Sequence, residues 1–292
     1  MKHILGISRS TVYSPNSTDR DSAIFTAVTS RLERMGHDVS IINEDLFFAV
    51  DLSDFDLVFS MARGHDVLNK LAHFEHEHPG RVINSAIVLS QNTRADIAKT
   101  LQANNIAMPH VAIASPKELL KTPQSYPIWL KRADACAQKA DDICYIDNEY
   151  SYHDALNGFV SKGIDMVIAE EHLAGDLIKF YGIQGTDFFY ITYPTENKTF
   201  SKFGLEATND AIKHYNFELS KFKETADNAA RCLGIVVYGG DAVVGNDGKC
   251  RIIDFNDWPS FAPCRKEAAK AIAYKINNII LTLQTLSRKK RS

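Results

Sequence analysis

The stretch that decides the fold is Asp241 to Pro259, with the sequence DAVVGNDGKCRIIDFNDWP. Two strand-like runs, 236–244 and 249–255, lie on either side of the pair Asp247-Gly248. An Asp-Gly pair favours a two-residue type I′ turn, because that turn requires positive φ at both central positions. The pattern therefore predicts an antiparallel β-hairpin with this pair at its tip.

The position of the turn fixes which residues of the hairpin face each other. With the turn at Asp247-Gly248, Asp241 lies directly opposite Asp254, and side-chain alternation places Asn256 on the same face. If the turn forms one residue earlier, Asp241 faces Ile252 and Asp254 becomes a diagonal neighbour on the same face. Both registers bring the two carboxylates together.

This shared face of Asp241, Asp254 and Asn256 is a candidate metal site. Carboxylates that lie directly opposite each other destabilise a sheet unless a cation lies between them. Two carboxylates and an amide carbonyl are hard oxygen ligands, which suit Mg²⁺ together with water or substrate phosphates. By pattern alone, an edge hairpin with solvated acids is an equally good interpretation.

The composition is ordinary for a soluble globular enzyme. A chain of 292 residues is long enough for two or three subdomains, and 45% hydrophobic with 24% charged residues is ordinary for such proteins. A net charge of −3 gives no reason to expect nucleic acid or a membrane as partner. The five cysteines form no CxxC, which favours reduced thiols. Without a recognisable signal peptide or apolar span, we expect a cytoplasmic protein.

Residues 1–90 alternate strand-like and helix-like segments, which predicts a parallel α/β domain. Ligands of such sheets bind beyond the carboxyl ends of the strands. The loop 8–21, SRSTVYSPNSTDRD, lies at that place, so Arg9, Ser14 and Asn16 are candidate substrate contacts. A plain surface loop explains them equally well.

Residues 91–292 read as two α+β units, with the hairpin near the end. The expected helices are 93–103, 150–162, 208–232 and a C-terminal helix, and the expected strands before the hairpin are 110–114, 126–132, 143–146, 166–172, 177–183 and 188–192.

Two further stretches carry chemistry. Lys131 ends the apolar strand YPIWLK; such a lysine usually extends to solvent, but beside magnesium it would neutralise polyphosphate. In 167–183, VIAEEHLAGDLIKFYGI, an apolar strand leads into Glu170-Glu171-His172-Leu173 and resumes as a strand that carries Lys179. The connection offers backbone donors and acceptors to a planar heterocycle, and Asp176 follows where an acid could accept hydrogen bonds from ribose.

In this order, the strand lysine, the acidic connection and the acidic hairpin resemble the ATP-grasp superfamily. The resemblance implies a preceding α/β domain at 1–90 and an ATP-grasp domain at 91–292, with a lid at about 110–172 and a C-terminal subdomain at about 173–292. It implies two Mg²⁺ ions, or Mn²⁺, on the hairpin acids, and ATP between the subdomains. The implied contacts are Lys131, Lys179 and, loosely, Arg94 for phosphates, Glu170, Glu171, His172 and Leu173 for adenine, Asp176 for ribose, and Asp241, Asp254 and Asn256 for the metals.

The chain departs from the family in two places. Segment 132–142 contains no glycine, although the family often covers the phosphates with a glycine-rich loop, so Arg132, Gln138 or Lys139 would act there instead. D-alanine–D-alanine ligases carry an arginine two residues before the first metal-binding aspartate, and this chain has Gly239. The second departure points towards relatives of glutathione synthetase and the ribosomal-protein glutamate ligases.

Other motifs are weaker. The histidines of HFEHEHPG (His73, His76 and His78) could bind a metal, but a solvated helix end explains them better. No GxSxG, P-loop or catalytic cysteine signature is present, and we expect Cys136 and Cys264 to be spectators.

The resemblance implies an ADP-forming ligase that joins a small-molecule carboxylate to an amine through an acyl phosphate. Ser260 and Arg265, in DWPSFAPCR, are candidate contacts for these substrates, although a loop and a helix start explain them too. A small-molecule kinase of the inositol-phosphate type and a non-catalytic nucleotide-binding protein are the alternatives. The sequence leaves a homodimer open.

Overall fold

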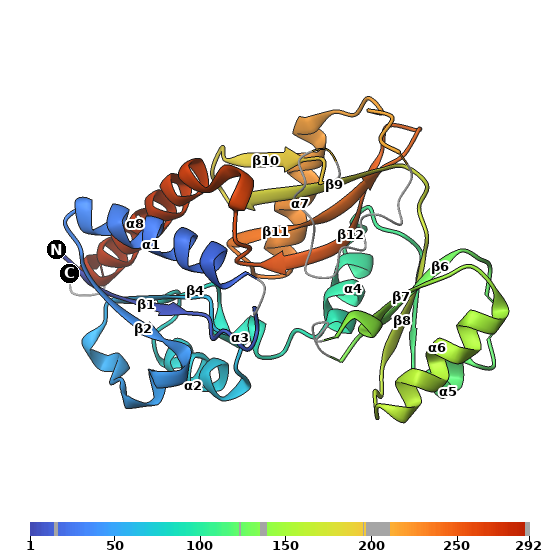
Figure 1. Cartoon of the computed structure of the whole chain (residues 1–292). Coiled ribbons are helices and arrows are strands. Elements are labelled where there is room, and N and C mark those ends of the chain that lie inside the picture. Colours follow the sequence, from blue (N-terminus) through green and yellow to red (C-terminus); the bar gives the residue numbers. More distant parts are fainter. Residues whose placement is uncertain (15–16, 123, 135–138, 195, 197–210, 290–292) are drawn as a thin grey trace.

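The structure is a computed structural model that describes residues 1–14, 17–122, 124–134, 139–194, 196 and 211–289. Its strands form three four-stranded sheets, which follow one another along the molecule in Figure 1. The fold is mixed α/β, with a parallel sheet at the N-terminal end and antiparallel sheets in the remainder, as the sequence predicts. Within the described residues, no helix combines the length and apolar character that a bilayer crossing requires.

The N-terminal sheet is parallel and has the strand order β2-β1-β3-β4. Its central strands are buried on both faces, because helices cover a parallel sheet from both sides. Helix α2 and two 3₁₀ helices pack on one face, and α1 packs on the other. The elements are β1 (His3–Ser8), α1 (Thr18–Arg34), β2 (Asp38–Asn43), η1 (Glu44–Ala49), η2 (Leu52–Asp54), β3 (Leu57–Ser60), α2 (His65–Glu77), β4 (Val82–Ile83) and α3 (Ala86–Leu89).

The C-terminal helix α8 (Arg265–Lys289) returns to this N-terminal sheet and lies beside α1 (Figure 1). Its buried face, which includes Ile272 and Ile276, shares one hydrophobic core with Ile4 of β1 and Phe59 of β3. The first and last parts of the chain are therefore packed as one body, although the sequence places a boundary at residue 90.

The lid sheet is antiparallel, with the strand order β5-β8-β6-β7. Two helices, α5 and α6, cover one face, and part of the opposite face packs on α4. Trp129, Lys131 and Glu170 lie on that second face, because side chains alternate along a strand. The elements are α4 (Arg94–Ala103), β5 (Val111–Ala114), α5 (Pro116–Leu119), β6 (Ile128–Arg132), η3 (Ala140–Asp142), β7 (Ile143–Ile146), α6 (Glu149–Ser161) and β8 (Val167–Glu171).

The third sheet is antiparallel, with the strand order β10-β9-β11-β12. Helix α7 covers one face with a core rich in aromatic rings, among them Phe180, Phe222 and Tyr238. The other face carries the polar residues of the candidate site. The elements are β9 (Asp176–Ile183), β10 (Phe189–Thr192), α7 (Leu219–Cys232), β11 (Val237–Val244), β12 (Cys250–Asp257) and η5 (Ala262–Cys264).

The predicted helix 208–232 is wrong in its first half. Residues 208–210 lie outside the described residues, 211–218 are not helical, and α7 begins at Leu219. His214 has φ 52°, a left-handed conformation that a helix does not contain. The amides on either side of it, at Lys213 and Tyr215, donate to the carboxylate of Asp176. These long-range bonds override the local helical preference of the segment.

The hairpin forms, but its turn is not type I′. Gly245 N donates to Lys249 O (3.0 Å) and Gly248 N to Gly245 O (3.0 Å); Gly248 has positive φ whereas Asp247 does not. This is the pattern of a longer loop that ends in a left-handed glycine.

A β-bulge then restores the predicted pairing farther from the turn. Asp241 lies opposite Asp254, whereas Ala242 lies opposite Ile252, so Ile253 is the extra residue of β12. The prediction that Asp241 and Asp254 face each other is therefore confirmed, although a bulge and a longer loop produce this pairing instead of a type I′ turn.

Candidate active site

Two rows of side chains cross the face of the third sheet that lies opposite α7. The first row, in strand order from β12 to β10, is Asp254, Asp241, Lys179 and Thr192. The second row lies two residues farther along each strand and is Asn256, Gly239, Tyr181 and Tyr190. The prediction that Asp241, Asp254 and Asn256 share a face is thus confirmed, and Lys179 lies on it as well.

Lys179 supplies a positive charge beside the two facing carboxylates, which would otherwise repel each other. Its ammonium lies 2.8 Å from Asp241 Oδ1, and Asn256 Nδ2 donates to Asp254 Oδ2 at 3.1 Å. Burial raises the pKa of Asp254, but the charges of Arg94, Lys131 and Lys179 outweigh it and leave this pKa below its usual value. Asp254 is therefore ionised at neutral pH and is available as a ligand.

The oxygen donors of this face fit a magnesium ion only with help from a ligand. Among the described residues, no cluster of three or more His, Cys, Asp or Glu could hold a metal. Asp241 and Asp254 supply two carboxylates, and Asn256 supplies an amide oxygen. Magnesium keeps several waters and is commonly held by one or two carboxylates plus substrate phosphates, so this donor set suits Mg²⁺ bound to a nucleotide.

Lys131 connects the lid sheet to the hairpin. Its ammonium donates to Glu170 Oε1 (2.6 Å) and to the carbonyl oxygen of Ile253 (3.0 Å). Ile253 is the bulge residue, so the irregularity of β12 turns this carbonyl towards the lid. An ammonium has three donors, which leaves one N–H of Lys131 beyond its two contacts within the described residues.

The sequence places Glu170 in the connection that would hold adenine, but the structure places it inside β8. Its side chain is buried and paired with Lys131. Burial raises the pKa of Glu170, and Asp254 adds to this, while Lys131 and Arg94 oppose it. The Glu170 carboxylate therefore sets the position of Lys131 instead of lining the connection.

Arg94 stands at the start of α4, as predicted. Its guanidinium donates to the carbonyl oxygen of Arg132 at 2.9 Å, which attaches the helix to the end of β6. Because Arg94 lies close enough to lower the pKa of Asp254, it belongs to the same electrostatic cluster as Lys131 and Lys179. Three cations thus surround the facing carboxylates.

The connection between β8 and β9 is anchored at its start. Glu171 N donates to His110 O (2.9 Å), and His172 N donates to Pro127 O (3.3 Å). The ring of His172 accepts a hydrogen bond from Trp129 Nε1 at 3.0 Å and lies edge-on to Tyr145. Leu173 follows and is half-buried. These contacts fix the start of the connection against the lid sheet.

Asp176 does not face the site. Only 1% of the residue is exposed, and its two oxygens accept hydrogen bonds from Lys213 N (2.6 Å) and Tyr215 N (2.7 Å). Both oxygens are used by backbone amides, so the ribose contact that the resemblance implies does not fit this geometry. The carboxylate instead anchors the segment before α7.

Replacing Asp176 with alanine is expected to lower the free energy of unfolding by at least about 2 kcal/mol, because two amides lose their acceptor. The dissociation constant of MgATP should change little. Urea unfolding followed by circular dichroism gives the first quantity, and isothermal titration calorimetry gives the second. Asp187→Ala, an exposed acid in the turn after β9, is the matched control. Weaker ATP binding at unchanged stability would restore the ribose role.

The exit of β12 is held by the N-terminal domain. Arg63 forms an ion pair with Asp257 and donates to its carbonyl oxygen (3.2 Å), and Arg9 donates to the carbonyl oxygen of Trp258 (3.1 Å). Arg9 also pairs with Asp21 at 2.9 Å. Arg9 therefore connects α1 to the segment that follows β12. Arg63 and Asp257 were not among the residues predicted from sequence; Asp257 is the last residue of β12, and Arg63 lies in the loop that follows β3.

The remaining candidates lie around this exit and on the lid. Ser260 and Arg265 are half-buried, and the buried Nε of Arg265 has no hydrogen-bond partner within the described residues. Ser14 accepts a hydrogen bond from Arg9 at 3.3 Å. Arg132 is engaged with Asp134 at 2.6 Å and 3.0 Å. Lys139 is exposed, Cys264 is buried, and Asn16, Cys136 and Gln138 lie outside the described residues.

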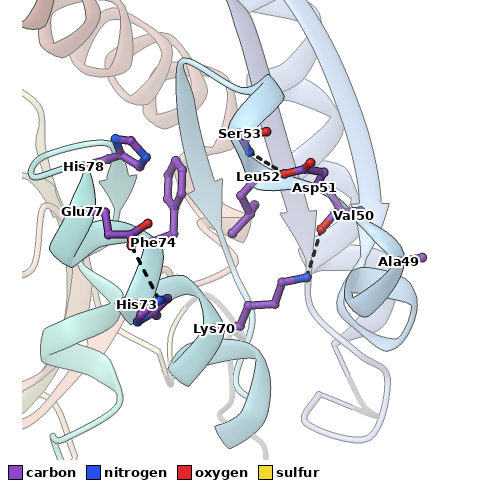
Figure 2. Close-up of a pocket in the computed structure, with 10 residues that line it drawn as sticks. All are labelled: Ala49, Val50, Asp51, Leu52, Ser53, Lys70, His73, Phe74, Glu77 and His78. Carbon is purple, nitrogen blue, oxygen red and sulfur yellow. Dashed lines mark hydrogen bonds and ion pairs between the residues drawn. The ribbon is translucent and has the colours of Figure 1, made fainter.

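A separate open groove of about 510 Å³ lies between α2 and the segment η1–η2 (Figure 2). It shares no residue with the two rows. Lys70 on its wall donates to Val50 O at 2.9 Å, and His73 Nε2 lies 3.8 Å from Glu77 Oε1. The histidines of this helix end form no metal cluster with other described residues. The groove therefore has no evident link to the site chemistry.

Neither a protein-family profile nor a curated protein sequence matches the chain. Solved structures do match it over nearly its whole length. A D-alanine–D-alanine ligase from Bacillus anthracis, in complex with ATP, has 12% identity and a TM-score of 0.60, with 100% of both chains covered. The ligase of the same name from Coxiella burnetii has 13% identity and a TM-score of 0.65, with 100% of this chain and 98% of that chain covered.

A RimK-domain ATP-grasp protein from Sphaerobacter thermophilus has 14% identity and a TM-score of 0.61, with 95% of this chain and 99% of that chain covered. At such identities the likeness shows the fold. The chain has the ATP-grasp fold, as the order of its strand lysine, acidic connection and hairpin predicts.

Proposed function

We propose that the protein is an ATP-dependent carboxylate–amine ligase that requires magnesium. The observation that carries this proposal is the contact of Lys131 with the carbonyl oxygen of Ile253, next to Asp254. Through it, a lysine of the lid sheet reaches the row that holds Asp241 and Lys179. A triphosphate between the two sheets would meet cations and metal-binding carboxylates together, which is the requirement of phosphoryl transfer.

Each part of the site has a task in this proposal. The backbone of Glu171, His172 and Leu173 holds adenine, and Arg94, Lys131 and Lys179 bind the phosphates. Asp241, Asp254 and Asn256 would hold magnesium, which neutralises charge on the phosphate oxygens when bound. Because Lys131 is largely shielded from water, its charge acts in a medium of low polarity and is stronger there.

The reaction then proceeds in two steps. A carboxylate oxygen of the substrate attacks the γ-phosphorus, the bond to the β,γ-bridging oxygen breaks, and ADP leaves with that electron pair. An amine next attacks the acyl carbon, the C–N bond forms, and phosphate departs. Neither step needs a protein nucleophile, and Ser260 and Arg265 stand near the exit of β12 where they could bind the carboxylate substrate or the amine.

Gly239 argues against close functional identity with the D-alanine–D-alanine ligases. A Cβ atom at this position would lie 2.8 Å from both the carbonyl oxygen of Phe180 and Cγ of Pro259. Side chains therefore cannot be added there without a backbone shift. The likeness to a RimK-domain ATP-grasp protein supports the wider proposal, because it does not depend on the D-alanine–D-alanine ligases alone.

The proposal is tested by incubating the protein with MgATP and pairs of amino acids or small carboxylates, including D-alanine and acetate. Equal amounts of ADP and phosphate, formed only when both substrates are present, are expected. With hydroxylamine as the amine, the acyl phosphate should yield a hydroxamate that forms a coloured iron complex. ADP without free phosphate would identify a kinase, and ATP binding without turnover would identify a non-catalytic protein.

A further inference from the structure

The second row of the catalytic face contains a gap beside a tyrosine. Gly239 lies between Asn256 on one side and Tyr181 on the other. A Cβ atom at residue 239 would lie 3.3 Å from Cδ1 of Tyr181, so the tyrosine ring rests against the glycine backbone. The ring of Tyr181 thus lies against the place that a side chain at residue 239 would occupy.

Tyr181 is buried but its hydroxyl is not sealed inside the protein. The residue is 9% exposed, and its ring packs 5.6 Å from that of Phe261. Within the described part of the chain, the hydroxyl has no hydrogen-bond partner, and it is not among the buried polar atoms that lack one. A hydroxyl in this situation retains access to the open face, where a ligand could accept its hydrogen bond.

The surroundings keep this hydroxyl protonated. Burial raises the pKa of Tyr181, and Asp241 raises it further, whereas Lys179 opposes the shift without reversing it. The phenol is therefore a neutral hydrogen-bond donor throughout the physiological pH range. The hydroxyl also lies near the first row, because the charges of both Lys179 and Asp241 shift its pKa.

The two rows are separated by a fixed distance along the strands. Two residues along a strand span roughly 6.6 Å. If the first row holds the phosphates, the second row lies one such step away, at the side where Arg63 and Arg9 attach the N-terminal domain. The acyl carbon, bonded through oxygen to the γ-phosphorus, would lie on that side.

We propose that Tyr181 is a further catalytic residue, whose hydroxyl donates a hydrogen bond to the acyl oxygen of the substrate. The inference rests on the proposed ligase function. When the amine lone pair forms the C–N bond, the C=O electron pair moves onto this oxygen, and the donor stabilises the resulting charge. The oxyanion then re-forms the carbonyl, the bond to phosphate breaks, and the amine proton passes to the departing phosphate. Tyr181 keeps its own proton throughout.

Tyr181→Phe tests this role because it removes the hydroxyl and keeps the ring packing. Hydroxamate formation is measured with MgATP, hydroxylamine and a panel of the protein amino acids, D-alanine and acetate. The variant is expected to lower kcat about 100- to 1000-fold, with the KM for ATP and the thermal midpoint unchanged. Tyr274→Phe, at an exposed tyrosine of α8 outside both rows, is the matched control and should retain wild-type rates.

The outcomes separate this inference from the function on which it rests. If the wild-type protein forms hydroxamate and Tyr181→Phe is equally fast, only the role of Tyr181 is overturned. If the variant loses rate together with stability and ATP affinity, the tyrosine is structural and the inference is also wrong. If the wild-type protein forms no hydroxamate with any carboxylate of the panel, the ligase proposal itself is overturned, and the role of Tyr181 with it.

Discussion

Replacing Asp254 with alanine is expected to lower ATP turnover by at least about 100-fold, because it removes the proposed metal ligand and the charge that faces Asp241. Asn256→Ala should have the same kind of effect, since its amide oxygen completes the donor set. Both variants should remain folded, because neither side chain contributes to a hydrophobic core. Turnover is followed as ADP release in a coupled assay, and circular dichroism confirms the fold.

The hairpin provides its own control for this experiment. Asp247 is an acid of the same element, but it lies at the turn and pairs with Arg251 at 2.7 Å. Arg251 holds the pKa of Asp247 at about 2, well below its usual value, so it is ionised like Asp254. Asp247→Ala should therefore leave turnover unchanged. Full activity in Asp254→Ala or Asn256→Ala would refute the metal assignment.

A direct measurement of the metal distinguishes a lost ligand from a lost phosphate contact. Mn²⁺ can replace Mg²⁺ at oxygen ligands of this kind, and its electron paramagnetic resonance signal reports binding. With ATP present, Asp254→Ala should bind Mn²⁺ more weakly than the wild-type protein, whereas Asp247→Ala should bind it equally well. Equal Mn²⁺ affinity in all three proteins would contradict the assignment even if turnover were lost.

Part of the hairpin face could be predicted from sequence because it depends on local rules. Strand alternation places Asp254 and Asn256 together. The bulge at Ile253 keeps Asp241 opposite Asp254, because without it the observed loop would place Asp241 opposite Ile253. The turn type was predicted wrongly, because the loop closes between Gly245 and Lys249 with only Gly248 at positive φ, and the bulge at Ile253 compensates for the one-residue shift. Lys131, which comes from another sheet, donates to the carbonyl oxygen of this bulge residue.

The features that sequence analysis missed all depend on contacts between distant residues. Asp176 has the spacing of a ribose acceptor, yet Lys213 and Tyr215 supply the amides that occupy it. The same two bonds prevent helix formation before Leu219. Arg63 meets Asp257 across 194 positions of the chain. Periodicity and motif spacing report which face a residue occupies, but not which remote group will neutralise or occupy it.

Ile272→Ala is expected to produce the largest loss of stability, about 2–5 kcal/mol, because it opens a cavity in a fully buried part of α8. That side chain lies in the core shared with β1 and β3, so the loss should extend to the N-terminal sheet. Tyr274→Ala, on the same helix but 56% exposed, should change stability by less than about 0.5 kcal/mol. Urea unfolding gives both values.

Hydrogen exchange then shows whether α8 and the N-terminal sheet unfold together. Amides of β1 (His3–Ser8) should lose protection in Ile272→Ala as strongly as amides of α8, because both rely on one core. A variant in which α8 exchanges faster while β1 keeps its protection would instead place the last helix in a separate folding unit. The exit of β12 runs into this helix, so cooperative unfolding would also make the geometry of Asn256 depend on the stability of the N-terminal domain.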